Sequence, residues 1–452
     1  MAGSGIRYWH LARELGRQQP VTLGTPAPVE LPAPPGVTIV AYGSPGDDED
    51  SRGRRLAALL DGHEVVVAQH LPYLHTEPEE LARRYLVVDL YAPWVLEKLE
   101  YARIDPARGE PNRKDDVEIL QRLLALGDFF MCASERQRDY WLGALTLAGR
   151  LDLAHAEADP ELRRLIDVVP FGLPDETPLK TGPGPRTIFS EIGRDDPLIL
   201  WNGGLWNWLD PLTAVRAIGI VARSRPNTRL VFMGTRSPGA QVAEMEIVAT
   251  ARTLAQELGL LDRNVFFNDW VGYDERQNWL LDADLTLSLH AHTVESRYSF
   301  RTRVLDNLWC GVPIVATEGD VLAELVEQYE IGATVPPGDA VAASQAIEHL
   351  LERETAWAMR ARIATVAPSF TWRAVTEPLL DYCRAPWRLG EARGSDASAA
   401  YLQKLERLYT ETAQYARDLE RAIAEKDAAL AAQPRHPRET FRSRLFRRGE
   451  GA

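Results

Sequence analysis

The feature that most constrains the fold is an alternation, repeated twice, of short apolar runs and amphipathic patterns. In the first half, apolar runs at 65–68 and 129–132 alternate with helical patterns such as 134–147. In the second half, the runs at 198–201 and 313–316 are again separated by helical patterns. Short, uninterrupted apolar strands between helices are typical of parallel sheets covered on both faces. The sequence therefore predicts an α/β protein with two doubly wound domains in tandem and a cleft between them.

Composition places the boundaries of these domains. Residues 175–197 are rich in proline and glycine and predict an interdomain linker. After Pro386, apolar residues follow a spacing of three and four, which predicts a helical, coiled-coil-like extension. The predicted parts are, in order, an N-terminal domain (1–174), the linker (175–197), a C-terminal domain (198–365), a closing helical segment (366–384), the extension (385–433) and a basic tail (434–452).

The extension and the tail leave alternatives open. The seam of the extension over 398–432 can pair with a second copy to form a homodimer, or it can pack on the chain's own globular part. The tail holds several arginines interleaved with Phe441, Leu445 and Phe446. Such a segment can lie on an anionic membrane surface, or it can be a disordered and solvated tail.

Charge and cysteine content argue against several classes of protein. The formal net charge of −14 argues against general affinity for nucleic acid. The three cysteines are far apart and form neither a metal-binding pattern nor a disulfide framework, as expected in a reducing cytoplasm. The sequence contains no run of about 18 apolar residues, so no transmembrane helix is predicted. We expect a cytoplasmic protein whose basic tail can contact the inner face of a membrane.

The first residues resemble the turn of a nucleotide-binding unit without the strand that usually precedes it. Gly3 and Gly5 lead directly into an amphipathic helix and would let the backbone approach a phosphate or a sugar, with Arg7 close behind. Because no apolar run precedes them, we expect that the first strand is missing or that the coding start lies upstream of Met1, and we favour the second. The alternative is that this stretch is only a turn.

One stretch, 299–317, combines a loop, a helix, a tight turn and a buried strand. Arg301 and Arg303 lie at the entrance of the predicted helix, where free backbone N–H groups already favour an anion. Asp306 lies one turn further along. These residues predict a pocket for phosphates and a hydroxylated group. The alternative is a surface ion pair between Arg303 and Asp306.

Further motifs, together with this stretch, give the chain a family resemblance. They are the turn Gly3-Ser-Gly-Ile-Arg7, the strand at 198–201 with Gly203 and Gly204 after it, and the run Ala-Asp-Leu-Thr-Leu-Ser at 283–288. Residues 1–384 resemble the retaining nucleotide-sugar glycosyltransferases of glycosyltransferase family 4, which have two facing Rossmann-like domains (the GT-B fold). The resemblance implies sugar transfer from a nucleotide-diphosphate sugar, held by the second domain. The first domain would hold a hydroxyl acceptor: a glycan, glycolipid or polysaccharide precursor, which can be lipid-linked.

Two departures from the family pattern concern charge. The stretch from Tyr298 to Asp306 resembles the family's Glu-x7-Glu element, but it has tyrosine at the first position and aspartate at the second. By resemblance, Asp306 would bind the ribose hydroxyls, and Glu295 or Asp320 would replace the first glutamate at the donor sugar. The loop 204–210 lacks the arginine and lysine that the family directs at the diphosphate.

The missing cations have to be replaced if the chain transfers sugar. A departing nucleoside diphosphate develops negative charge, which a preorganised cation stabilises. We expect Arg301 and Arg303 to supply that charge, with Arg7 closing over the same phosphates, and Arg303→Ala to lose transfer while the fold is kept. Asp89 ends a strand of the first domain and is expected to orient the acceptor hydroxyl or act as its base; the alternative is a turn residue.

The predicted site has three groups of residues. They are catalytic residues (Arg301, Arg303, Asp89), donor-binding residues (Gly203, Gly204, His290, Glu295, Tyr298, Ser299, Phe300, Asp306, Gly319) and a phosphate or acceptor loop (Gly3, Gly5, Arg7). No metal is predicted, because the pair Asp282 and Asp284 precedes its strand, whereas ligands gather at carboxyl ends of strands. No cofactor is expected besides the nucleotide sugar as co-substrate. Other classes stay open: a nucleotide-sugar epimerase, a non-catalytic partner or scaffold of a transferase, and a decayed site.

Overall fold

The computed structural model describes residues 3–44, 46–69, 83–104, 106–236 and 245–389, together with 415, 419, 421–423 and 426. Residues 1–390 form one compact unit and 391–452 a second. The predicted coiled-coil seam and basic tail lie outside the described residues, apart from the few positions between 415 and 426, which are helical. The fold below is that of the first unit, which contains a first lobe (to residue 174) and a second lobe (198–350).

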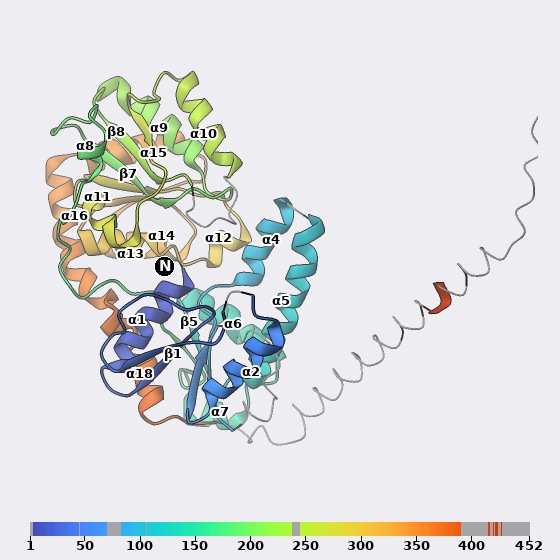
Figure 1. The fold of residues 1–452 in the computed structure, drawn as a ribbon. Helices are drawn as coiled ribbons and strands as arrows, with labels where there is room; N and C mark the ends of the chain where they lie inside the picture. The colour runs from blue at the N-terminus through green and yellow to red at the C-terminus, as the bar shows by residue number, and fades with distance from the viewer. Residues whose placement is uncertain are drawn as a thin grey trace, which may run out of the picture. The chain divides into compact units, whose positions relative to one another are not determined.

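The first lobe contains two parallel sheets rather than the single sheet that the sequence predicts. β1 pairs with β2, while β3, β4, β5 and β6 are hydrogen-bonded in that order. Among the described residues no ladder joins β1 to β3, so the strands divide into two sheets. The elements, many of them labelled in Figure 1, are α1 (Ser4–Gly16), β1 (Val21–Thr25), β2 (Val37–Ala41), α2 (Glu49–Leu60), β3 (Val65–Ala68), β4 (Tyr85–Asp89), α4 (Trp94–Ile104), α5 (Pro106–Leu126), β5 (Phe129–Cys132), α6 (Glu135–Leu147), α7 (Leu153–Ala158) and β6 (Ile166–Val168).

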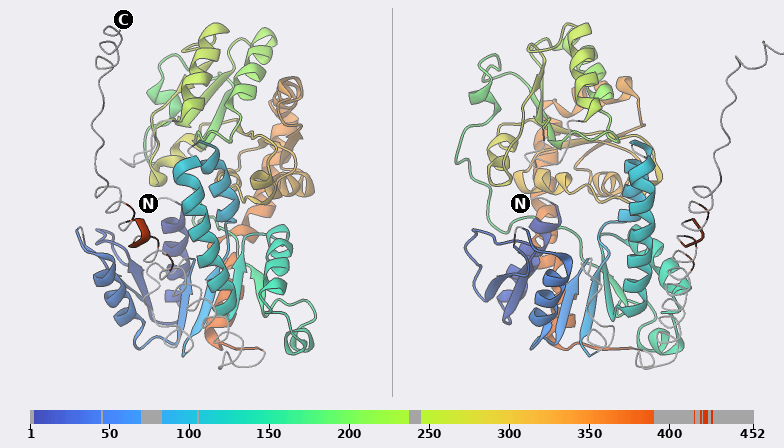
Figure 2. Two further views of the ribbon diagram at one scale, coloured as in Figure 1. Left: turned by 90° about the vertical axis from the view of Figure 1, so that its right-hand side faces the viewer. Right: turned by 45° about the vertical axis from the view of Figure 1, so that its right-hand side comes forward.

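β4 and β5 form the buried centre of the larger sheet. Their apolar residues are almost wholly shut off from solvent, as expected for parallel strands covered on both faces. Helix α6 begins at a side-chain cap, because the Ser134 hydroxyl accepts a hydrogen bond from the Gln137 N–H at 3.1 Å. The helices α4 and α5 run side by side, as the two views in Figure 2 show.

The second lobe is built on one six-stranded parallel sheet in the order β12-β11-β10-β7-β8-β9. This matches the doubly wound domain that the sequence predicts, including the strands expected at 198–201 and 313–316. The elements from the linker onward are α8 (Pro185–Ile188), β7 (Leu198–Gly204), α9 (Pro211–Ser224), β8 (Arg229–Gly234), α10 (Glu246–Glu257), β9 (Val265–Phe267), η1 (Tyr273–Glu275), α11 (Arg276–Leu280), β10 (Leu285–Ser288), α12 (Val294–Tyr298), α13 (Arg303–Cys310), β11 (Ile314–Thr317), α14 (Val321–Tyr329), β12 (Gly332–Val335) and α15 (Ala340–Leu350).

One edge of this sheet gathers the elements that matter for function. Fully buried side chains such as Trp201, Ile218 and Phe232 fix β7, α9 and β8 in the core of the lobe. Because β7, β10 and β11 are parallel, their carboxyl ends lie at the same edge of the sheet, where α9, α12 and α14 begin. Asp210 caps α9 and Asp320 caps α14 through their carboxylates. In open α/β sheets, ligands bind outside the carboxyl ends of the strands.

The closing segment returns the chain to the first lobe. It comprises α16 (Arg353–Val366), η2 (Ala367–Phe370), α17 (Trp372–Val375) and α18 (Glu377–Arg384). Trp372 is fully buried and stacks on His10 of α1 with ring centroids 4.8 Å apart, and Tyr382 stacks on Phe129 of β5 at 4.8 Å. The predicted helical extension does not begin at 385, because residues 385–389 are not helical. Instead, Trp387 packs on Tyr382 and donates its indole N–H to the Arg164 carbonyl at 2.8 Å.

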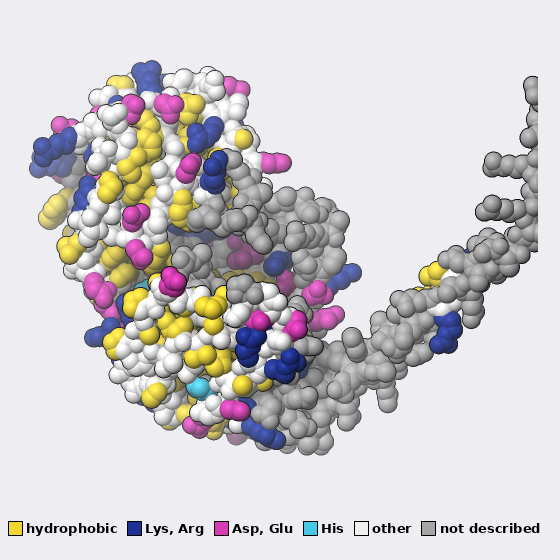
Figure 3. Space-filling model, in the orientation of Figure 1, with side chains coloured by type: hydrophobic (Ala, Val, Ile, Leu, Met, Phe, Trp, Pro, Cys, Tyr) yellow, Lys and Arg dark blue, Asp and Glu magenta, His cyan; other side chains and the backbone are white. Residues whose placement is uncertain are grey.

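The surface of the described residues is mixed in charge. On the face shown in Figure 3, acidic and basic side chains are interspersed over both lobes. Across the described part of the chain, no helix is both long and apolar enough to cross a membrane.

Arg7 and Asp89 form a fully buried ion pair that fastens α1 to the end of β4. Nε of Arg7 donates to Asp89 at 2.7 Å, Nη2 donates to Asp89 and to the Val169 carbonyl, and Nη1 donates to the Pro170 carbonyl. Neither side chain is exposed to solvent. The predictions that Arg7 closes over phosphates and that Asp89 acts on the acceptor are therefore corrected. Each neutralises the other, because a buried charge requires a partner.

Arg7→Ala is expected to lower the free energy of unfolding by about 3 to 5 kcal/mol, because it leaves the Asp89 carboxylate buried without its cation. Denaturant unfolding followed by circular dichroism measures this loss. The matched control is Arg13→Ala, which removes a partly exposed ion pair of the same helix with Glu14. Equal losses in the two variants would contradict a structural role for the Arg7–Asp89 pair.

Candidate functional site

A side-chain hydrogen bond holds the end of β7 against the start of α13. Asn202 is buried, and its Nδ2 donates a hydrogen bond to the Arg303 carbonyl at 3.0 Å. Gly203 follows with a φ of +96°, a conformation that favours glycine. This sharp turn brings the backbone of Gly203 and Gly204 against the side chain of Arg303. A Cβ built at Gly203 would lie 3.6 Å from Cζ of Arg303.

Arg303 is a cation with too few partners. Its Nη2 lies 3.5 Å from the Gly204 carbonyl, which is at the limit of a hydrogen bond. Its Nη1 is shut off from solvent and, among the described residues, has no hydrogen-bond partner. Burial, and next the positive charge of Arg301, lower the pKa of Arg303 to about 10, although the Asp306 carboxylate opposes the shift. An anion placed here would relieve that cost.

Arg301 belongs to a buried network of charged and polar side chains. Its Nη2 donates to Glu295 at 2.9 Å, and its Nε lies 3.9 Å from the Asp320 carboxylate without a hydrogen-bond partner among the described residues. His290 Nε2 lies 3.1 Å from the same Asp320 carboxylate. The positive charge of Arg301 is therefore largely balanced by carboxylates, whereas that of Arg303 is not.

The first lobe also faces this network. Helix α4 contacts α12, and the pKa of Glu97 on α4 is raised, first by burial and then by the negative charge of Glu295, although Arg301 opposes the shift. Sequence reasoning missed Glu97, because nothing in its helical surroundings distinguishes it from a surface glutamate.

Asp306 pairs with a residue that the sequence did not suggest. Its Oδ1 accepts a hydrogen bond from Nε of Arg276 at 2.8 Å, and no Arg303–Asp306 ion pair is found among the described residues. The Arg276 guanidinium also lies over the rings of Tyr273 and Trp309, at 3.7 and 4.8 Å from their centroids. Burial raises the pKa of Asp306, although Arg276 opposes this. About a fifth of the Asp306 side chain is exposed, and Asp306 lies on the first turn of α13, as Arg303 does.

Tryptophans fill the position where the family directs its cations. Trp206 and Trp208 stack with centroids 5.4 Å apart. A Cβ built at Gly204 would lie 3.5 Å from Trp206 and 3.7 Å from Trp270, so both rings lie beside that glycine. Trp270, which follows β9, is 41% exposed and so presents part of its ring to solvent. The loop therefore offers aromatic surface beside the Arg303 guanidinium.

The remaining predicted residues divide between this site and its surroundings. Gly319 has a φ of +98° and lies beside His292, while Ser299 is buried at the end of α12 and Phe300 packs on the apolar cluster shared by the lobes. Gly3 and Gly5 begin α1, and a Cβ at either position would meet open space. Tyr298 contacts the first lobe and is treated below.

The structure thus brings together Gly203, Gly204, His290, Glu295, Arg301, Arg303 and Asp306 at one sheet edge. It takes Arg7 and Asp89 out of this set. Within the described ranges, no group of three His, Cys, Asp or Glu side chains is arranged to hold a metal ion. The absence of a metal requirement stays a prediction.

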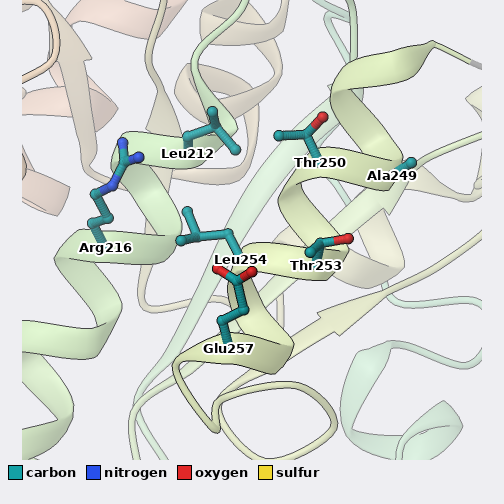
Figure 4. A pocket seen from close by; sticks show the side chains of 7 residues that line it. All are labelled: Leu212, Arg216, Ala249, Thr250, Thr253, Leu254 and Glu257. Carbon is teal, nitrogen blue, oxygen red and sulfur yellow. The ribbon is translucent and has the colours of Figure 1, made fainter.

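A shallow pocket elsewhere on the second lobe lacks this chemistry. Figure 4 shows its lining side chains on two neighbouring helices, with Leu212 and Arg216 on α9 and Thr250, Leu254 and Glu257 on α10. It has no glycine turn and no pair of cations, so we do not assign it to the site.

Comparison with known proteins identifies the class of fold first. The two lobes of parallel sheet form the GT-B fold of glycosyltransferases, as the sequence predicted. Sucrose-phosphate synthase from Thermosynechococcus elongatus has a TM-score of 0.58 at 16% identity, with 85% of this chain and 93% of that one covered. Anabaena HepE, solved with UDP and glucose, has a TM-score of 0.58 at 16% identity, with 85% and 96% covered. A glycosyltransferase from Rickettsia africae has a TM-score of 0.59 at 13% identity, with 84% and 94% covered.

The sequence itself matches a narrower group over the second lobe. Residues 196–353 match the family model described as glycosyl transferases group 1. No curated protein matches the chain in a sequence search. The more specific prediction of glycosyltransferase family 4 is compatible with these matches.

Arg303→Met is expected to raise the free energy of unfolding at pH 7 by about 1 to 3 kcal/mol, because it removes a partly buried charge that has no anionic partner among the described residues. The pKa of about 10 lies below the usual 12.5, so the folded state disfavours the proton and the charge penalty is fully present at neutral pH. The difference between variant and wild type should shrink as the pH rises through 10. Thermal and denaturant unfolding measure both effects. A destabilised variant would show that the guanidinium is held by structural contacts instead.

Proposed function

We propose that the protein is a retaining glycosyltransferase, independent of metal, that moves a sugar from a nucleotide-diphosphate sugar to a hydroxyl acceptor. The observation that carries this proposal is the under-partnered Arg303 guanidinium beside the Gly203–Gly204 turn, at the sheet edge where such folds bind ligands. Anabaena HepE, with the same fold, has been solved with UDP and glucose, which supports a nucleotide-sugar donor.

We assign the diphosphate to Arg303 on electrostatic grounds. When the bond between the anomeric carbon and the phosphate oxygen breaks, negative charge collects on the departing diphosphate. A fixed cation stabilises that charge without the reorganisation that water would need. Arg303 meets this requirement because its Nη1 has no partner among the described residues. Arg301 can contribute through its Nε, which has no hydrogen-bond partner among the described residues, but its charge is shared with Glu295 and Asp320.

The neighbouring groups fit the rest of a donor. The Asp306 carboxylate, held by Arg276, can accept hydrogen bonds from the ribose hydroxyls. We assign the donor sugar to Glu295, which pairs with Arg301, and to His290, which lies beside Asp320. Trp270 offers an exposed ring on which a flat group can stack.

The reaction then needs no covalent enzyme intermediate. The acceptor oxygen attacks the anomeric carbon from the face that the diphosphate leaves, so the configuration at that carbon is retained. The acceptor's proton passes to the departing phosphate oxygen. The chain's own residues hold the donor and stabilise the leaving group.

A nucleotide-sugar epimerase is separated from this proposal by an incubation without acceptor. An epimerase would convert the nucleotide sugar under those conditions, whereas a transferase would leave it unchanged apart from slow hydrolysis. A non-catalytic partner would neither bind a nucleoside diphosphate nor transfer sugar.

A thermal-shift screen of nucleoside diphosphates is expected to identify at least one that raises the melting temperature of the wild-type protein, since a ligand at a hundredfold its Kd stabilises by about 2.7 kcal/mol. Arg303→Met should abolish that shift and lower kcat by about 100- to 1,000-fold with the matching nucleotide sugar.

Arg216→Ala is the matched control, because it removes an arginine of the same lobe outside the site (Figure 4). It should keep both the shift and the turnover. Unchanged turnover in Arg303→Met, or the same melting shift in all three proteins, would overturn the assignment of Arg303.

A further inference from the structure

Tyr298 occupies the position where the resembling family has its first glutamate, and its contacts here lead away from a sugar. Its ring packs against Tyr140 of the first lobe, with centroids 4.9 Å apart. Its backbone carbonyl accepts a hydrogen bond from Nε2 of Gln137 at 2.8 Å. Burial, and next the Tyr298 hydroxyl, raise the pKa of Tyr140, which agrees with close packing of the two rings. Position 298 is thus a contact between the lobes.

Arg136 makes a second set of contacts from the same helical turn. Its Nη1 donates to the Arg297 carbonyl at 3.0 Å and to the Gly319 carbonyl at 2.6 Å, and its Nη2 pairs with the Glu324 carboxylate of α14. Arg297 lies between Glu295 and Arg301 in the chain, and Gly319 directly precedes Asp320, so both carbonyls neighbour residues of the Arg301 network. One guanidinium therefore ties together two donor-side segments that are 22 residues apart in the chain.

These side chains are themselves anchored in the first lobe. Gln137 is fully buried, and its Oε1 accepts a hydrogen bond from the Ala133 N–H at 2.9 Å. One turn later, the buried Trp141 donates its indole N–H to the Leu90 carbonyl at 3.0 Å. The first turn of α6 is capped by Ser134. The contacts to the second lobe consequently come from a rigid support.

We propose that Arg136, Gln137 and Tyr140 form a clasp by which the first lobe sets the backbone of Tyr298 and Gly319, and with it the donor-sugar end of the site. They are positioning residues, because they touch backbone and a tyrosine ring rather than reacting atoms. This inference rests on the proposed function. It also explains the loss of the family glutamate: the position has become part of the clasp, and Glu295, held by Arg301, supplies the carboxylate.

The chemistry of the clasp requires these residue types. An arginine can donate to two carbonyls and a carboxylate at fixed angles, whereas a lysine is a point charge without that fork. A phenylalanine at 298 keeps the ring contact with Tyr140. A glutamate there would place a carboxylate against that ring and lose the contact.

The first test uses hydrogen exchange on the full-length protein without ligand. In Arg136→Ala, peptides covering 296–299 and 318–321 should exchange at least about tenfold faster than in the wild type, because their carbonyls lose a donor from the other lobe. Arg163→Ala is the matched control. It removes an ion pair with Glu135 on the same turn of α6 without reaching the second lobe. Unchanged exchange in Arg136→Ala, or equal changes in both variants, would overturn the clasp.

The second test measures transfer with the nucleotide sugar found above. Arg136→Ala and Tyr298→Glu should each lower kcat/KM for the donor by roughly ten- to a hundredfold. Tyr298→Phe should stay within a few-fold of wild type, and Arg136→Lys should recover only part of the loss. If Tyr298→Glu instead matches or exceeds wild-type turnover, position 298 binds the sugar and the clasp is wrong.

The two tests separate this inference from the proposed function. Hydrogen exchange needs neither donor nor acceptor, so it reports on the clasp even if the wild type transfers no sugar. Loss of transfer in Arg303→Met with normal exchange at 296–299 would leave both proposals standing.

Discussion

The structure depends on a partly buried positive charge, that of Arg303, beside a backbone turn that favours glycine. Gly203, at a φ of +96°, brings the end of β7 against α13 and places the Arg303 guanidinium beside the backbone, with its Nη1 shut off from solvent. The Asn202 amide fixes this geometry by donating to the Arg303 carbonyl. Elsewhere in the same lobe, arginines such as Arg276 and Arg301 have acidic partners within hydrogen-bond distance. The unpaired charge of Arg303 costs stability at a position where a bound anion would restore it, as is common at functional sites.

The first lobe contributes rigidity more than chemistry. Its two residues that looked reactive in sequence, Arg7 and Asp89, neutralise each other in the interior. What it presents to the second lobe is a capped helix, α6, whose side chains hold backbone carbonyls in place. A rigid first lobe and a charged second lobe suit a reaction whose main requirement is to hold a charged leaving group and an acceptor in the correct relative orientation.

Sequence reasoning found the elements and the sheet edge, but it did not find which side chains pair within the site. The helix from Arg303, the left-handed Gly311 and the strand after Pro313 follow from local patterns, and the structure has all three. The true partner of Asp306 could not be found in this way, because Arg276 lies 30 residues earlier and is brought near only by packing. The Arg7–Asp89 pair, 82 residues apart, was missed for the same reason. The role of α6 was invisible too, since its acceptors are carbonyls, which every residue has.

The return of α17 and α18 to the first lobe has a consequence for biosynthesis. Trp372 fills the space beside His10, and Tyr382 covers Phe129, so the interior of the N-terminal half includes side chains that are synthesised only after the second lobe. Domains generally fold as units while the chain emerges from the ribosome. The N-terminal half, which is synthesised first, therefore cannot complete its hydrophobic core until the second half has been synthesised and has supplied those aromatic side chains.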